Sequence, residues 1–153
     1  PHCNAFEPTL EAWVKSLPKD VSFKRVPVAF RDDFAPQQRL FYTLEALNKV
    51  DEYQRKVFHA VHVERQSLNS DEAILAWATK QGFDMARFTE AYRSFSVASK
   101  LRKAVQLQDA YKVEGVPSLG IAGLYYTDGS LAGSMDRALQ VADHLIAEAR
   151  KSR

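Results

Sequence analysis

Helical patterning runs almost unbroken from Ala35 to about Tyr111, and this long block limits the folds that the chain can adopt. Apolar residues recur in it every three or four positions, as on the buried face of an amphipathic helix. We expect a further long helix from about Val97 to Tyr111. The expected inward-facing residues are Leu40, Phe41, Leu44, Leu47, Val57, Phe58, Val61, Met85, Phe88, Tyr92, Leu101, Ala104 and Val105.

The ends of these helices carry local signals of their own. Aspartate, asparagine and serine favour N-cap positions because their side chains accept hydrogen bonds from free backbone N–H groups. We therefore expect Asp51, Asn69 or Ser70, and Asp84 to begin three of the helices. Gly82 suits the C-terminus of the helix before Asp84, because glycine tolerates a positive φ.

Segments with strand character flank the helical block. Val21–Phe30 is rich in β-branched and aromatic residues and predicts a strand, although Pro27 lacks the N–H that a ladder requires. Downstream, residues 115–130 predict a hairpin with a tight turn at Ala122 and Gly123.

Two further helices complete the pattern. One runs from the first residues to about Leu17, where Pro18 ends it, and an amphipathic helix capped by Ser134 closes the chain. The order is helix, strand, a block of helices, strand, strand, helix. This order predicts an α/β unit with a helical insertion.

Bulk composition excludes some classes of function. The net charge of +2 comes from 21 basic and 19 acidic residues spread along the chain, so no basic stripe for nucleic acid is present. The longest nearly uncharged run, Val116 to Thr127, is too short to span a bilayer. One cysteine in 153 residues does not fit a secreted domain built on disulfides.

That single cysteine, Cys3, stands in the stretch "PHCNAFEP" at a predicted helix start. Free backbone N–H groups and the helix dipole favour a thiolate there, and His2 can add positive charge or a hydrogen bond. Proline in the first turn costs nothing, because its missing donor would be unpaired. The arrangement suits sulfur chemistry if the residue before Pro1 is another cysteine.

The stretch resembles the active-site helix of the DsbA group of periplasmic thiol:disulfide oxidoreductases, whose motif is Cys-Pro-His-Cys followed by a Phe-Glu pair. Pro1, His2 and Cys3 match the last three motif positions, and residues 6–7 match the pair. Val116 and Pro117 match the family's cis-proline loop, and the order of elements agrees throughout.

The resemblance implies a thioredoxin-like α/β fold with an inserted α-helical domain. Residues 1–34 and 99–153 would form the thioredoxin-like parts, and residues 35–98 the insertion. We expect the first strand or strands of the sheet to be missing from this chain, which we interpret as N-terminally incomplete.

The resemblance also implies site residues and a mechanism. Pro1, His2 and Cys3 would be catalytic, with the nucleophilic cysteine just before Pro1. Cys3 would be the resolving cysteine, more buried and less ionised, which attacks the mixed disulfide and releases the substrate. Val116 and Pro117 would lie beside the dithiol, where an extended substrate peptide pairs with the backbone.

Partners and location follow from the same resemblance. The implied partners are unfolded exported proteins with free thiols, and a quinone-linked membrane protein that reoxidises the enzyme in the periplasm. No cofactor or metal is required, because the cysteines carry the electrons. His59 and His62 lie three residues apart and could bind a metal only weakly.

Two alternatives remain open. A kappa-class glutathione transferase also inserts helices into a thioredoxin unit, and a serine before Pro1 would favour it. A non-catalytic substrate-binding or chaperone module could keep the fold without turnover.

Overall fold

The structure, a computed structural model, describes residues 2–152 and divides the chain into two compact units. The terminal unit comprises Pro1–Lys24 and Asp109–Arg153, and the helical unit comprises Arg25–Gln108. The helical unit thus includes residues on both sides of the expected insertion at 35–98. The three-part division of the chain therefore stays a prediction.

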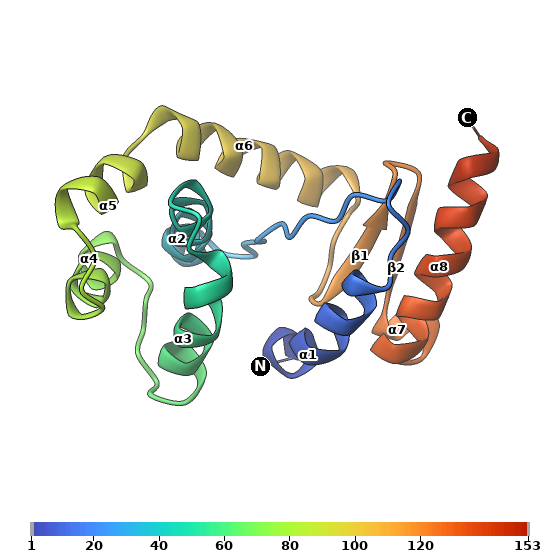
Figure 1. The fold of residues 1–153 in the computed structure, drawn as a ribbon, viewed down its shortest axis with the longest axis horizontal. Coiled ribbons are helices and arrows are strands. Elements are labelled where there is room, and N and C mark those ends of the chain that lie inside the picture. The colour runs from blue at the N-terminus through green and yellow to red at the C-terminus, as the bar shows by residue number, and fades with distance from the viewer. Residues whose placement is uncertain (1, 153) are drawn as a thin grey trace. The chain divides into compact units, whose positions relative to one another are not determined.

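Helices dominate the described residues (Figure 1). The helical unit contains the 3-10 turn η1 (Asp32–Phe34), α2 (Ala35–Ala46), α3 (Val50–His62), α4 (Asp71–Lys80), α5 (Met85–Tyr92) and most of α6 (Phe95–Ala110). The terminal unit contains α1 (His2–Lys15), β1 (Ser118–Ile121), β2 (Tyr125–Asp128), α7 (Gly129–Ala132) and α8 (Met135–Lys151). Among the described elements, η1 and α7 have no counterpart in the elements expected from the sequence.

The core of the helical unit is built mainly from the apolar stripes of its helices. Burial of these side chains stabilises the unit, since each large apolar group removed from water contributes about 1.5–3 kcal/mol. Edge-to-face and tilted contacts join several of the rings, and Tyr53 lies 4.5 Å from Phe83 between ring centroids. The main cluster comprises Leu40, Leu44, Tyr53, Ala60, Leu68, Ile74, Trp77, Ala78, Phe88 and Tyr92.

Three of the expected helix ends are confirmed. The Ser70 hydroxyl accepts a hydrogen bond from the first turn of α4, and the Asp84 carboxylate accepts two from the first turn of α5. Gly82 follows α4 with a φ of 85°, a conformation that costs glycine little. Side-chain hydrogen bonds and backbone geometry therefore complete these helix ends at the positions that the sequence predicts.

Two expectations for individual residues are wrong. α3 begins at Val50, so Asp51 lies inside its first turn and does not cap it. An acidic side chain there still interacts favourably with the helix dipole. Val105 was expected to face inward but is 44% exposed, whereas Ala104 beside it is buried. The buried face of α6 is thus narrower than the apolar pattern of its sequence predicts.

The strand expected at Val21–Phe30 is also wrong, because the segment contains no strand. Side-chain amides instead pair with the backbone of two of its residues, Pro27 and Ala29. Gln38 Nε2 donates to the Pro27 carbonyl at 2.9 Å, and Gln108 exchanges two 3.0 Å hydrogen bonds with the backbone of Ala29. A ladder needs a neighbouring strand and a free N–H at every second residue, and Pro27 has none.

The hairpin of the terminal unit is confirmed. β1 and β2 pair antiparallel, with Ile121 opposite Tyr125 across the loop. Ala122 and Gly123 have φ values of 58° and 71°, as a type I′ turn requires, and the Leu124 N–H donates to the Ile121 carbonyl at 2.9 Å. This geometry fixes the register of both strands.

α8 holds the terminal unit together by contacting α1, α7 and both strands. The Ser134 hydroxyl caps it as expected. Trp13 in α1 donates its indole N–H to Asp143 in α8 at 2.9 Å. Arg150 forms two hydrogen bonds to the Asp20 carboxylate, at 2.7 and 3.1 Å. These contacts join the N-terminal helix to the C-terminal one.

Candidate redox site

Cys3 is the second residue of α1, with His2 before it. The first four N–H groups of a helix have no intrahelical acceptor, so free donors surround this position. The Cys3 side chain is partly buried and forms no disulfide, and His2 is exposed. Pro1, the third expected catalytic residue, lies outside the described residues.

Two opposing effects act on the Cys3 thiol. The helix dipole favours the thiolate, whereas burial favours the neutral thiol. Burial raises the pKa of Cys3 above its ordinary value, and the Glu7 carboxylate one turn further along α1 raises it too. Burial is the largest cause of the raised pKa, and with the pKa raised Cys3 is mostly a neutral thiol near pH 7. This direction agrees with a less ionised second cysteine.

Phe6 explains why this turn of α1 is held in place. It is 8% exposed and is the buried residue of the helix, three positions after Cys3. Residues three apart share a helix face. The buried Phe6 ring therefore holds the face of α1 that carries the thiol against the rest of the terminal unit.

The second expected site element leads into β1. The peptide bond between Val116 and Pro117 is cis, as expected, and Val116 is 41% exposed. Both residues belong to the same terminal unit as His2 and Cys3. The structure thus places the two motifs, more than 110 residues apart in sequence, in one compact unit.

A hydrogen-bonded cluster supports the loop before β1, and the sequence reasoning missed it. The Ser118 hydroxyl donates to the Gly115 carbonyl at 2.6 Å and lies 2.9 Å from the Tyr126 hydroxyl. Tyr126 in turn donates to Asp128 at 3.1 Å. Ser118 and Asp128 are register partners, so aligning the two predicted strands would have paired these polar residues.

The two histidines considered for a metal have other contacts. His59 Nδ1 lies 3.1 Å from Glu64 Oε1, and the His62 ring stacks on Phe58 at 5.8 Å. Across residues 2–152 no group of three or more His, Cys, Asp or Glu side chains could hold a metal ion. The same residues contain no helix that is both long and apolar enough to cross a membrane.

The helices around a small antiparallel sheet, with a cysteine at a helix start and a cis-proline loop, define the class of thioredoxin-fold proteins with a helical insertion. Residues 1–145 match the family described as the DSBA-like thioredoxin domain, and the chain belongs to this family.

Named relatives agree with this assignment. The chain is 43% identical to the thiol:disulfide interchange protein DsbA of Bordetella parapertussis over 152 residues, which cover 99% of this chain and 72% of the relative. It is 36% identical to the DsbA of Pseudomonas aeruginosa over 150 residues, covering 98% of this chain and 71% of the relative. The chain thus spans somewhat under three quarters of these relatives.

Solved structures agree as well. The crystal structure of Pseudomonas aeruginosa DsbA superposes with a TM-score of 0.91 and 36% identity, covering 99% of this chain and 79% of that one. The structure of DsbA from Xylella fastidiosa superposes with a TM-score of 0.86 at 21% identity, covering 99% and 81%, which bears on the fold alone. The expected thioredoxin-like fold with an inserted helical domain is therefore confirmed.

Proposed function

We propose that this protein is a thiol:disulfide oxidoreductase that introduces disulfide bonds into exported proteins. Membership of the DSBA-like family supports the reaction, since the named relatives are thiol:disulfide interchange proteins. The observation that carries the proposal is the position of Cys3, the only cysteine of the chain, as the second residue of α1. A thiol in that position can exchange with a neighbouring disulfide sulfur.

The proposed active pair is a Cys-Pro-His-Cys motif, with its first cysteine just before Pro1 and Cys3 as its second. A substrate thiolate attacks the first cysteine's sulfur, the bond to Cys3 breaks, and Cys3 leaves with the electron pair and takes a proton. A second substrate thiolate then attacks the mixed disulfide and expels the first cysteine as a thiolate. The substrate loses two electrons and the pair gains them.

The raised pKa of Cys3 has a clear role in this scheme. Of two neighbouring thiols, the more exposed one at the helix start ionises first. Burial keeps Cys3 protonated after it leaves, so it does not compete with the first cysteine for the free N–H groups of α1. In the reverse direction, Cys3 attacks the mixed disulfide and releases the substrate.

The remaining residues have supporting roles in the proposal. His2 adds a polar, exposed group beside the pair, and Pro1 is the second residue of the proposed motif. Val116 and Pro117 offer backbone for strand-like pairing with an extended substrate. The proposed partners are unfolded exported proteins with free thiols, and a quinone-linked membrane reoxidase in the periplasm.

Substitution of Cys3 in the complete gene product tests the proposal. Cys3→Ser cannot form the oxidised pair, so we expect it to lower the turnover of dithiol-peptide oxidation at least about 100-fold. When the peptide is supplied in its disulfide form, the remaining cysteine should attack it and form a mixed disulfide, with release of one peptide thiol. Asn4→Ser, an exposed change at the next position, should oxidise the peptide like the wild type. Unchanged oxidation in Cys3→Ser would overturn the proposal, and an absence of exchange in the wild type would favour the non-catalytic module.

A further inference from the structure

A side-chain hydrogen bond closes the loop that leads into β1. The Ser118 hydroxyl donates to the Gly115 carbonyl at 2.6 Å, so the bond joins the residues on either side of Val116 and Pro117. The proton of a serine hydroxyl rotates toward whichever acceptor is offered. The geometry of this loop therefore depends on the groups that fix the Ser118 hydroxyl.

Tyr126 and Asp128 of β2 supply those groups. Ser118 and Asp128 are register partners, and Tyr126 lies two residues before Asp128, so the three side chains share one face of the hairpin. The Tyr126 hydroxyl lies 2.9 Å from Ser118 Oγ and 3.1 Å from Asp128 Oδ2. Asp128 is fixed in turn, since its Oδ1 accepts from the Leu131 N–H at 2.8 Å. A chain of hydrogen bonds thus runs from the start of α7 to the loop before β1.

The two hydroxyls of this chain have two protons for three oxygen–oxygen contacts. Burial raises the pKa of Tyr126 above its ordinary value, so the tyrosine keeps its proton near neutral pH. The Ser118 proton is used in the bond to Gly115, which is the shortest of the three contacts. The Tyr126 proton therefore serves both Ser118 and Asp128. Because Ser118 Oγ accepts from Tyr126, its own proton is directed toward Gly115.

We propose that Ser118, Tyr126 and Asp128 are positioning residues for substrate binding, which hold residues 115–117 in the orientation that pairs with an extended peptide. This role rests on the proposed function, and it concerns the peptide backbone of the substrate, not the exchange of sulfur. Val116 is 41% exposed, so the loop is open to a peptide. A loop that is fixed in advance loses less conformational freedom on binding. Loss of the cluster should therefore slow reaction with peptides and spare reaction with small thiols.

Two dithiol substrates separate this role from sulfur chemistry. The complete gene product is oxidised and then mixed with an excess of a dithiol peptide or of dithiothreitol, which has no peptide backbone. Mass spectrometry of the alkylated protein gives the second-order rate constant for each substrate. We expect Tyr126→Phe, which removes only the hydroxyl, to slow the reaction with the peptide about fivefold and to change the reaction with dithiothreitol by less than about 1.5-fold.

The outcomes of this experiment distinguish the two proposals. A wild type that reacts with neither substrate would overturn the proposed function and the positioning role with it. A wild type that reacts with both substrates, while Tyr126→Phe changes both rate constants equally or changes neither, would overturn the positioning role alone.

Variants of Ser118 give an independent test. Ser118→Ala removes the bond to Gly115 and should slow the reaction with the peptide about fivefold, whereas Ser118→Thr keeps a hydroxyl and should react at close to the wild-type rate. The double variant of Ser118→Ala and Tyr126→Phe should be slowed little more than either single variant, because both changes break one chain of hydrogen bonds. A double variant slowed by the product of the two single effects would overturn the shared role.

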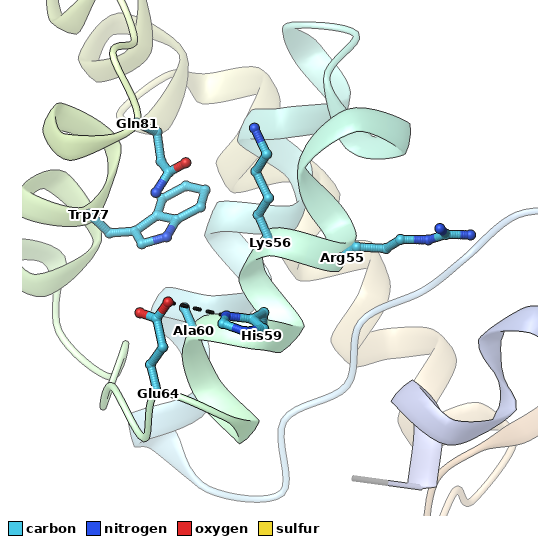
Figure 2. Close-up of a pocket in the computed structure, with 7 residues that line it drawn as sticks. All are labelled: Arg55, Lys56, His59, Ala60, Glu64, Trp77 and Gln81. Carbon is cyan, nitrogen blue, oxygen red and sulfur yellow. Dashed lines mark hydrogen bonds and ion pairs between the residues drawn. The ribbon is translucent and has the colours of Figure 1, made fainter.

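Two variants of the helical unit are the controls. Tyr92→Phe removes another tyrosine hydroxyl that donates to an aspartate, Asp71, at 2.6 Å. His59→Ala breaks the pair with Glu64, 3.1 Å away, in the hollow that both residues line (Figure 2). Both variants should react with the peptide at the wild-type rate. Slowing in Tyr92→Phe as large as in Tyr126→Phe would show a general effect of lost stability and would overturn the proposal.

Discussion

The Tyr111 ring lies directly against the backbone of Gly120 and leaves no room for a side chain there. A Cβ atom at Gly120 would come within 2.8 Å of the ring carbon Cζ, and Tyr111 also accepts a 2.7 Å hydrogen bond from the Gly123 N–H through its hydroxyl. The residue just after α6 therefore packs on β1 and holds the turn of the hairpin.

Alanine at Gly120 tests this contact. We expect Gly120→Ala to lower the free energy of unfolding by about 1–3 kcal/mol, because the ring must shift away from the strand. Urea denaturation followed by circular dichroism measures the effect. Gly115→Ala is the control, since a Cβ there meets no atom within 4 Å. Equal stability of Gly120→Ala and the wild type would show that Tyr111 moves without cost.

The cap of α5 predicts a contrast between two aspartates. Asp84 accepts hydrogen bonds from Ala86 N and Arg87 N at 3.1 and 3.4 Å, so Asp84→Ala should cost about 1–2 kcal/mol in the free energy of unfolding. Asp51 lies in a first turn without capping α3, so Asp51→Ala should lose only about 0.3–1 kcal/mol. Chemical denaturation of both variants measures the difference, and a larger loss in Asp51→Ala would contradict it.

Stability at alkaline pH should depend on buried tyrosines. Burial, with Glu45 nearby, raises the pKa of Tyr42 to about 12, and burial with the hydrogen bond to Asp71 raises the pKa of Tyr92 further. The folded protein therefore holds these protons more tightly than the unfolded chain, whose tyrosines ionise near about pH 10. Their stabilising effect is complete below pH 10 and is lost as the pH rises toward 12.

Each such tyrosine contributes a slope of up to ~1.4 kcal/mol per pH unit in this window. Tyr42→Phe should therefore make the fall in stability between about pH 10 and 12 shallower, since one ionising group is removed. Urea denaturation at a series of pH values measures the slope. Tyr125→Phe, at a half-buried position of β2, is the comparison. An unchanged slope in Tyr42→Phe would rule out this tyrosine as a source.

The reactivity of Cys3 should respond to Glu7. Since the Glu7 carboxylate raises the pKa of the thiol, Glu7→Gln should increase the thiolate fraction and the rate of alkylation of reduced protein by iodoacetamide by about twofold at pH 8. Mass spectrometry of the peptide that contains Cys3 measures this rate. Glu11→Gln, one helical turn further on, should change it less. A slower reaction in Glu7→Gln would contradict the electrostatic effect.

The sequence by itself determined the features that depend on near neighbours. Ser70, Asp84 and Ser134 cap helices because a side chain needs only an N–H two or three residues away. The turn at Ala122 and Gly123 follows from local dihedral preferences in the same way. The stretch "PHCNAFEP", together with Val116 and Pro117, also indicated the family, because a sequence motif can be recognised without knowing the fold.

Only the tertiary structure decided features that depend on distant atoms. The segment at Val21–Phe30 looks like a strand, yet side-chain amides from residues 38 and 108 take its backbone groups, which no local pattern reveals. The pKa of Cys3 rises mainly because of burial, which is a sum over the surrounding atoms. Helix caps depend on neighbours along the chain, whereas burial is a property of the packed molecule.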